Sequence, residues 1–180
     1  MNNQLLLVLP WYLSRASAIA AYVLTFLIIF LGTGMTTGFI YKFINPVRAW
    51  VVHKYLGIAV LVTVIVHPVS LLFDRFMNFS AQDIFIPFVS NFKPVFLSFG
   101  IIGFYILLLV VLTSLMMRLK HSYFWRVVHY LTYLFFVLSF FHGIFLGTDT
   151  QYLAMQILYW ATGIIFLILM IYRLFFYHRL

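Results

Sequence analysis

The chain of 180 residues is too apolar for a soluble domain, because 66% of its residues are hydrophobic, only 8% are charged and its mean hydropathy is +1.11. It contains no cysteine, which excludes disulfides, iron–sulfur clusters, thiolate zinc sites and covalently attached haem. The net charge of +8 arises from basic residues beside apolar segments, so it indicates contact with membrane lipid headgroups and not with nucleic acid.

Five apolar segments are long enough to cross a bilayer, which takes about 20 residues of helix. In chain order, we expect membrane spans at Ser14–Leu31, Ala49–Phe73, Val95–Met117, Val127–Leu146 and Tyr152–Tyr172. Continuation of the first span toward Ile40 stays open, although Gly32, Gly34 and Gly38 weaken a helix there. The segment Phe73–Pro94 mixes charges, prolines and phenylalanines, and it predicts a loop in the membrane interface with a short helix.

These segments predict an all-α fold: a multi-pass transmembrane bundle of about five spans and a sixth, short interfacial helix, in a single domain over residues 1–180. The N-terminus lacks a positive region and a small-residue cleavage site, so we expect no cleavable signal peptide. No Gly-rich nucleotide-binding loop follows a strand, and no soluble segment is long enough for a flavin domain.

Basic residues are distributed unequally between the two ends of the predicted spans. One side carries only basic residues: Lys42, Arg48, Lys54, Arg118, Lys120, Arg126, Arg173 and Arg179. The other side carries both signs of charge: Arg15, Arg75 and Lys93 with Asp74, Asp83 and Asp149. Basic residues are enriched on the cytoplasmic side of membrane proteins. We therefore expect a cell-membrane protein with its N-terminus outside and its C-terminus in the cytoplasm.

Four histidines lie inside the predicted spans, where an ionisable side chain is costly without a partner. His53 and His67 lie on the second span, and His129 and His142 lie on the fourth, which runs parallel to it. His53 is therefore level with His129 near the cytoplasmic side, and His67 is level with His142 near the outer side. His53 and His67 are fourteen residues apart and share nearly one helix face with Gly57. His129 and His142 are thirteen residues apart, which rotates one from the other by about 140° on a straight helix.

Each level supplies two imidazoles, and this number fits a haem iron better than zinc. Structural zinc requires three or four protein ligands, whereas a haem iron needs only two axial ligands. We expect two b-type haems, with His53 and His129 on the inner iron and His67 and His142 on the outer iron. Such haems carry electrons and leave no open position for a substrate.

The anionic haem propionates need cationic partners near the two interfaces. Arg126 and Lys54 are the candidates for the inner haem, and Arg15 is the candidate for the outer one. Anchoring to lipid headgroups is the alternative role for all three. We expect His121 and His178, in polar flanks, to be ordinary interfacial residues.

Two other interpretations of the span histidines stay open. The chain would be a transporter that moves protons or metal ions on its histidines, although the spans lack the acidic residues that such proteins use. Alternatively, it would be a haem-free scaffold subunit whose histidines form hydrogen bonds between helices.

Several segments resemble the bacterial ferric-reductase-like transmembrane domain, whose superfamily includes ferric reductases, NADPH oxidases and the haem subunit of the methionine-sulfoxide reductase system. The similar segments span about residues 12–150: Ser14-Arg15, His53, His67-Pro68, Pro87-Phe88, Trp125–Tyr133, His142-Gly143 and Gly147–Asp149. The resemblance implies paired histidines on two parallel helices, with the fourteen- and thirteen-residue spacings seen here. It also implies the membrane haem subunit of an oxidoreductase. The expected donor is a cytoplasmic flavin reductase or a membrane quinol, and the expected outer acceptor is a ferric chelate, oxygen or a redox protein.

Overall fold

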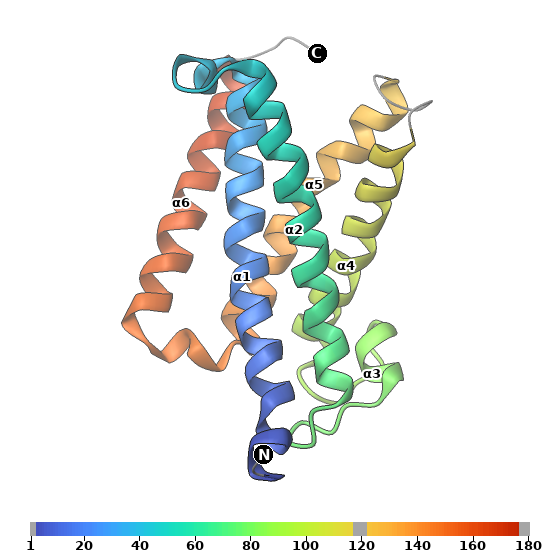
Figure 1. Ribbon diagram of the computed structural model, residues 1–180. Coiled ribbons are helices and arrows are strands. Elements are labelled where there is room, and N and C mark those ends of the chain that lie inside the picture. The colour runs from blue at the N-terminus through green and yellow to red at the C-terminus, as the bar shows by residue number, and fades with distance from the viewer. Residues whose placement is uncertain (1–2, 117–121, 177–180) are drawn as a thin grey trace.

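The computed structural model describes residues 3–116 and 122–176, which form a bundle of helices without a β-strand (Figure 1). The elements are α1 (Asn3–Thr37), the 3₁₀ helix η1 (Phe39–Lys42), α2 (Pro46–Leu72), α3 (Ala81–Phe85), α4 (Pro94–Leu115), α5 (Tyr123–Leu146), the 3₁₀ helix η2 (Thr148–Gln151) and α6 (Leu153–Phe176). Within this part of the chain, five helices are long and apolar enough to cross a membrane: α1, α2, α4, α5 and α6. The predicted all-α, multi-pass fold is confirmed.

Three basic residues of the predicted charge pattern lie outside the described residues, namely Arg118, Lys120 and Arg179. The two expected interfacial histidines, His121 and His178, also lie outside them. Among the described elements, α1 begins at one end of the bundle and α6 finishes at the other (Figure 1). The helices α2 and α5 run in the same direction, as expected for two spans separated by one crossing (Figure 1).

The first helix is longer than the sequence predicted. It begins at Asn3, before the expected start at Ser14, and passes Leu31 through Gly32 and Gly34 to Thr37, which is the continuation toward Ile40 that the sequence left open. Both glycines are placed where neighbouring side chains come close, since a Cβ at Gly34 would lie 3.1 Å from the Cβ of Ile40. Tertiary packing therefore outweighs the low helix propensity of glycine. The chain leaves the helical path at Gly38, whose φ of +76° is a left-handed conformation.

Side-chain caps define the starts of α2 and α5. The side-chain oxygen of Asn45 accepts the Val47 N–H at 2.9 Å, and the Ser122 hydroxyl accepts the Trp125 N–H at 3.1 Å. Each bond satisfies one N–H group of a first helical turn, which has no partner within the helix. These caps extend both helices a few residues beyond the starts that hydropathy predicted.

The expected interfacial loop between α2 and α4 contains the short helix α3 at its centre. Ser80 and Asp83 form a capping box, in which the Ser80 hydroxyl and N–H donate to the Asp83 carboxylate at 2.6 and 2.9 Å. These hydrogen bonds hold the pKa of Asp83 below its usual value. Before α3, the buried Asp74 carboxylate accepts the N–H groups of Phe76 and Met77, which holds the turn that leaves α2.

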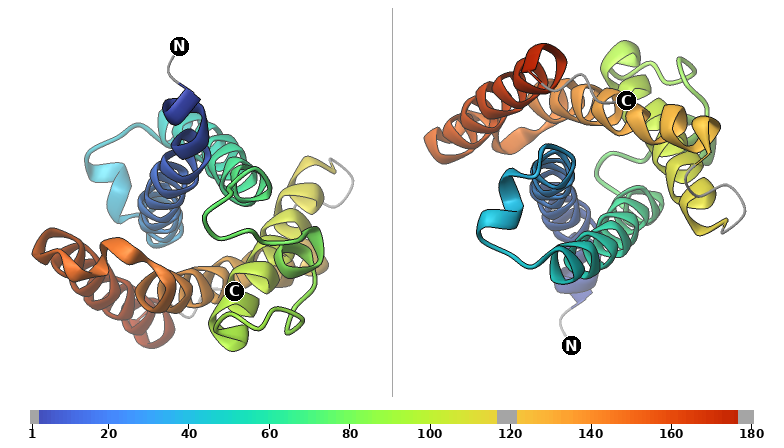
Figure 2. Two further views of the ribbon diagram at one scale, coloured as in Figure 1. Left: turned by 90° about the horizontal axis from the view of Figure 1, so that it is seen from below. Right: turned by 90° about the horizontal axis from the view of Figure 1, so that it is seen from above.

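Two antiparallel helix pairs, α1 with α2 and α4 with α5, form the most extensive contacts of the bundle. Viewed along the bundle, α1 and α2 lie on one side, and α4, α5 and α6 form a curved wall on the other (Figure 2). The buried core between α1, α5 and α6 consists of Tyr22, Ile29, Phe136, Tyr159 and Phe166. This arrangement places α2 and α5 opposite each other across the interior.

A buried hydrogen bond of 2.6 Å joins the Tyr22 and Thr162 hydroxyls and thereby connects α1 to α6. We expect Tyr22→Phe to lower the free energy of unfolding by about 1 kcal/mol, because the Thr162 hydroxyl keeps its bond to the Leu158 carbonyl and no buried group loses its last partner. Tyr12→Phe is the matched control, since Tyr12 lies on the same helix but is 60% exposed. Denaturant titration in detergent measures the difference, and equal stability of the two variants would contradict the role of this bond.

Candidate functional site

The four span histidines come together as two pairs between α2 and α5. The ring centroids of His53 and His129 are 6.2 Å apart, and those of His67 and His142 are also 6.2 Å apart. The rings of the first pair are inclined at 49° and those of the second at 85°. The thirteen-residue spacing on α5 therefore does not prevent pairing, and both pairs have the members that the sequence predicted.

Main-chain carbonyls orient the rings of the second pair. His67 Nδ1 lies 2.9 Å from the Ser14 carbonyl of α1, and His142 Nδ1 lies 2.9 Å from the Phe96 carbonyl of α4. A carbonyl only accepts, so Nδ1 carries the proton in both rings and Nε2 is left with a free lone pair. This is the tautomer in which a histidine binds a metal through Nε2 while its other nitrogen is held in place.

Packing, and not hydrogen bonding, holds the rings of the first pair. The Nδ1 atoms of His53 and His129 are buried without a hydrogen-bond partner. The Trp125 ring stacks on the His129 ring with centroids 4.8 Å apart and planes inclined at 23°. Buried ring nitrogens without partners are costly inside a bundle, so these two neighbouring imidazoles are candidates to bind a ligand.

Two glycines allow the main chain to approach these rings. A Cβ at Gly100 on α4 would lie 2.5 Å from Nδ1 and 3.0 Å from Nε2 of His142, and a Cβ at Gly32 on α1 would lie 3.1 Å from Cε1 of His53. Sequence reasoning missed both residues. It selected Gly57 instead, which shares a helix with His53 but faces α1, where an added Cβ would lie 3.4 Å from Cδ1 of Ile28. Hydropathy gives no signal for Gly100, because the contact depends on how α4 faces α5.

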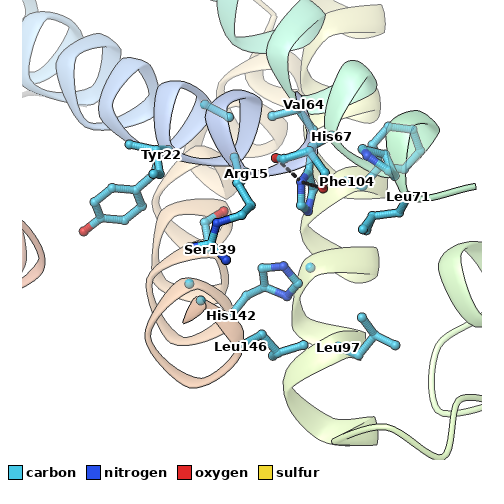
Figure 3. A pocket seen from close by; sticks show the side chains of 18 of the residues that line it. Arg15, Tyr22, Val64, His67, Leu71, Leu97, Phe104, Ser139, His142 and Leu146 are labelled. Carbon is cyan, nitrogen blue, oxygen red and sulfur yellow. Dashed lines mark hydrogen bonds between the residues drawn. The ribbon is translucent and has the colours of Figure 1, made fainter. Parts of the chain in front are cut away.

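A cavity of about 280 Å³ opens beside the second pair and is lined by residues of α1, α2, α4, α5 and α6, of η2 and of the segment between α2 and α4. The side chains of Arg15, His67 and His142 point toward it (Figure 3). Arg15 also forms an ion pair with Asp149 and lies over the Trp11 ring, 4.6 Å from its centroid. Arg15 thus lines the same cavity as His67 and His142, and its pairing with a haem propionate stays a prediction.

The two cations expected at the other pair are placed differently. Arg126 on α5 and Lys54 on α2 are exposed, and the Lys54 ammonium lies 5.9 Å from the centroid of the Trp50 ring. Neither forms a salt bridge in the described part of the chain, where Arg15 and Asp149 form the single ion pair.

The family model for the ferric reductase-like transmembrane component matches residues 16–140, more than half of the chain. The chain belongs to the ferric reductase-like transmembrane family. No curated protein and no solved structure matches it. The match includes His53, His67 and His129 and ends two residues before His142. Membership of this family indicates transmembrane electron transfer by a multi-pass membrane protein.

Ferric reductase-like domains typically bind haem, and the histidine geometry of this chain fits that cofactor. Two imidazoles on opposite faces of one metal, each with an N–metal bond of about 2.0 Å and about 1.1 Å from nitrogen to ring centre, have centroids about 6.2 Å apart. Two imidazoles hydrogen-bonded to each other would be closer, at about 5 Å. The observed separation of 6.2 Å in both pairs matches the first arrangement. A multi-ligand zinc site is not supported, since the described residues contain no group of three metal-binding side chains.

We expect Gly100→Ala to displace the His142 ring, because the added methyl would overlap a ring whose Nδ1 is held by the Phe96 carbonyl. The variant should lose the haem bound by His67 and His142 and keep the other, as measured by haem content per chain. Gly57→Ala is the matched control, since its methyl would make only an ordinary contact with Ile28. Full haem content in Gly100→Ala would show that this close approach is not required.

Proposed function

We propose that this chain conducts electrons across the cell membrane on two b-type haems, one held by His53 and His129 and the other by His67 and His142. The observation that carries the proposal is the ring separation of 6.2 Å, repeated in both pairs, which leaves room for one metal ion. When bound, bis-histidine haems supply two one-electron carriers with closed coordination spheres.

The residues of the chain hold and space the two sites. His53 and His67 are fourteen residues apart on α2, so their Cα atoms are about 21 Å apart along the helix axis. Both pairs therefore fit within one bilayer thickness of about 30 Å. At the outer pair, the Ser14 and Phe96 carbonyls keep both rings in the ligating tautomer and make Nε2 more basic.

The two histidine pairs differ in the charged residues that lie near them. At the outer pair, Arg15 supplies a cation beside the cavity, where it can pair with a haem carboxylate, and Asp149 positions it. Asp74, Asp83 and Asp149, the three acidic residues of the chain, all lie on the side of this pair, which favours an orientation with the N-terminus outside.

The site chemistry makes this chain the membrane haem subunit of an oxidoreductase. A closed iron coordination sphere requires electrons to enter and leave at the haem edges, from and to other molecules. We propose a cytoplasmic flavin reductase or a membrane quinol as the donor and a ferric chelate, oxygen or a redox protein as the outer acceptor. A metal-ion transporter gains no support, because the described residues contain no group of three metal-binding side chains.

Spectra of single-histidine variants test the assignment of ligands. The purified protein, expressed with an adequate haem supply, should contain two haems per chain by the pyridine haemochrome assay. His53→Ala and His129→Ala should lose one and the same haem, and His67→Ala and His142→Ala should lose the other, because a bis-histidine site needs both rings. A wild-type protein without a Soret band would refute the proposal, and so would haem loss that does not follow the two pairs.

Electron transfer itself can be measured in proteoliposomes that contain the haem-loaded protein. With reductant on one side and a membrane-impermeant ferric chelate on the other, we expect reduction of the chelate in the wild type and its loss in all four single-histidine variants. Ion uptake by haem-free protein, without any transfer of electrons, is the outcome that would favour a transporter.

A further inference from the structure

Arg173, near the C-terminal end of α6, is a half-buried cation with only neutral partners. Its guanidinium donates to the Tyr133 hydroxyl at 2.5 Å and to the Tyr130 hydroxyl at 3.1 Å. It also lies over both rings, 4.9 Å from the Tyr130 centroid and 5.5 Å from the Tyr133 centroid. Among the described residues no carboxylate pairs with it, since the three acidic side chains lie toward the opposite end of the bundle and the one ion pair found there joins Arg15 to Asp149.

This cation is connected to the elements that hold His53 and His129. Tyr133 lies one turn after His129 on the same face of α5. The Tyr133 hydroxyl also lies 3.1 Å from the hydroxyl of Thr33, which is buried on α1. Thr33 directly follows Gly32, whose main chain packs against the His53 ring. Arg173 therefore connects α6 to α5 and α1, the helices that pack around the His53 and His129 rings.

A guanidinium has five N–H donors, and the two tyrosines use only two of them. The remaining donors and the uncompensated charge suit a carboxylate or a phosphate, which arginine binds in a bidentate manner. Hydrogen bonds and ring contacts with two tyrosines hold the side chain in one place, which reduces the entropy lost on binding. Such an anion could belong to a haem or to a lipid headgroup, and the connection to both helices of the histidine pair favours the haem.

We propose that Arg173, positioned by Tyr130 and Tyr133, binds a carboxylate of the haem held by His53 and His129. This proposal rests on the proposed function and differs from the sequence-based expectation, which placed Arg126 there. The Arg126 side chain is exposed on the surface of α5, whereas the Arg173 side chain is partly buried between α5 and α6.

The test uses the full chain with His67→Ala, so that the inner haem is the only one present, in vesicles of defined composition. In this background, Arg173→Gln should lower the haem midpoint potential, because loss of a nearby positive charge disfavours the reduced form. The resonance Raman bending band of the haem propionates should shift as well. Tyr133→Phe should shift the same band by releasing the guanidinium, and Arg173→Lys should keep the potential near that of the background while changing the band.

Arg48→Gln is the matched control, because it removes an equal charge from an exposed position at the start of α2. If Arg173→Gln has the same midpoint potential and Raman spectrum as Arg48→Gln, this inference is wrong, and the proposed bis-histidine haem is unaffected.

A larger change of midpoint potential in Arg126→Gln would assign the carboxylate to that residue instead. An effect of Arg173→Gln that disappears in vesicles without anionic lipid would identify a lipid phosphate as the ligand. Where Arg173→Gln does not assemble, Arg173→Lys with an unchanged propionate band overturns the inference.

Discussion

An imidazole inside a bilayer is costly unless its polar nitrogens have partners, and the two histidine pairs of this ferric reductase-like protein differ in how the bundle meets this need. At the His67–His142 pair, carbonyls of α1 and α4 satisfy Nδ1 of both rings. At the His53–His129 pair, Nδ1 of both rings has no hydrogen bond; the Trp125 ring stacks on His129, and the main chain at Gly32 packs close to His53. The same ring separation is thus maintained by two different kinds of support.

The helices form two antiparallel pairs, α1 with α2 and α4 with α5, and this explains why the paired histidine rings are not hydrogen-bonded to each other. The α1–α2 and α4–α5 pairs pack closely within themselves, and contacts between α2 and α4 or α5 are few. Space therefore remains between the two helix pairs. Within each pair a glycine, Gly32 of α1 or Gly100 of α4, lets the main chain pack against a histidine ring of the partner helix. Larger residues at these two positions would displace the rings.

Much of this architecture could be predicted from the sequence, because hydropathy and histidine spacing follow directly from helix geometry. The five spans, the parallel course of α2 and α5 and the membership of both histidine pairs were predicted correctly. The extent of α1, the role of Gly100 and the position of Arg173 were not. These features depend on which face of one helix meets its neighbour, and apolar helices whose residues are hydrophobic on all sides carry little information about that choice.

The acceptors of His67 and His142 are peptide groups of Ser14 and Phe96, and this has a genetic consequence. Every amino acid supplies a main-chain oxygen, so no point mutation at either position deletes this acceptor; a substitution of Ser14 removes only its hydroxyl, which also lies 3.1 Å from His67 Nδ1. Only a shift or break of the helix can remove it. The His129 ring instead stacks on the indole of Trp125, which a single codon change replaces. Side-chain replacement is therefore buffered at the His67–His142 pair and directly affects the support of His129.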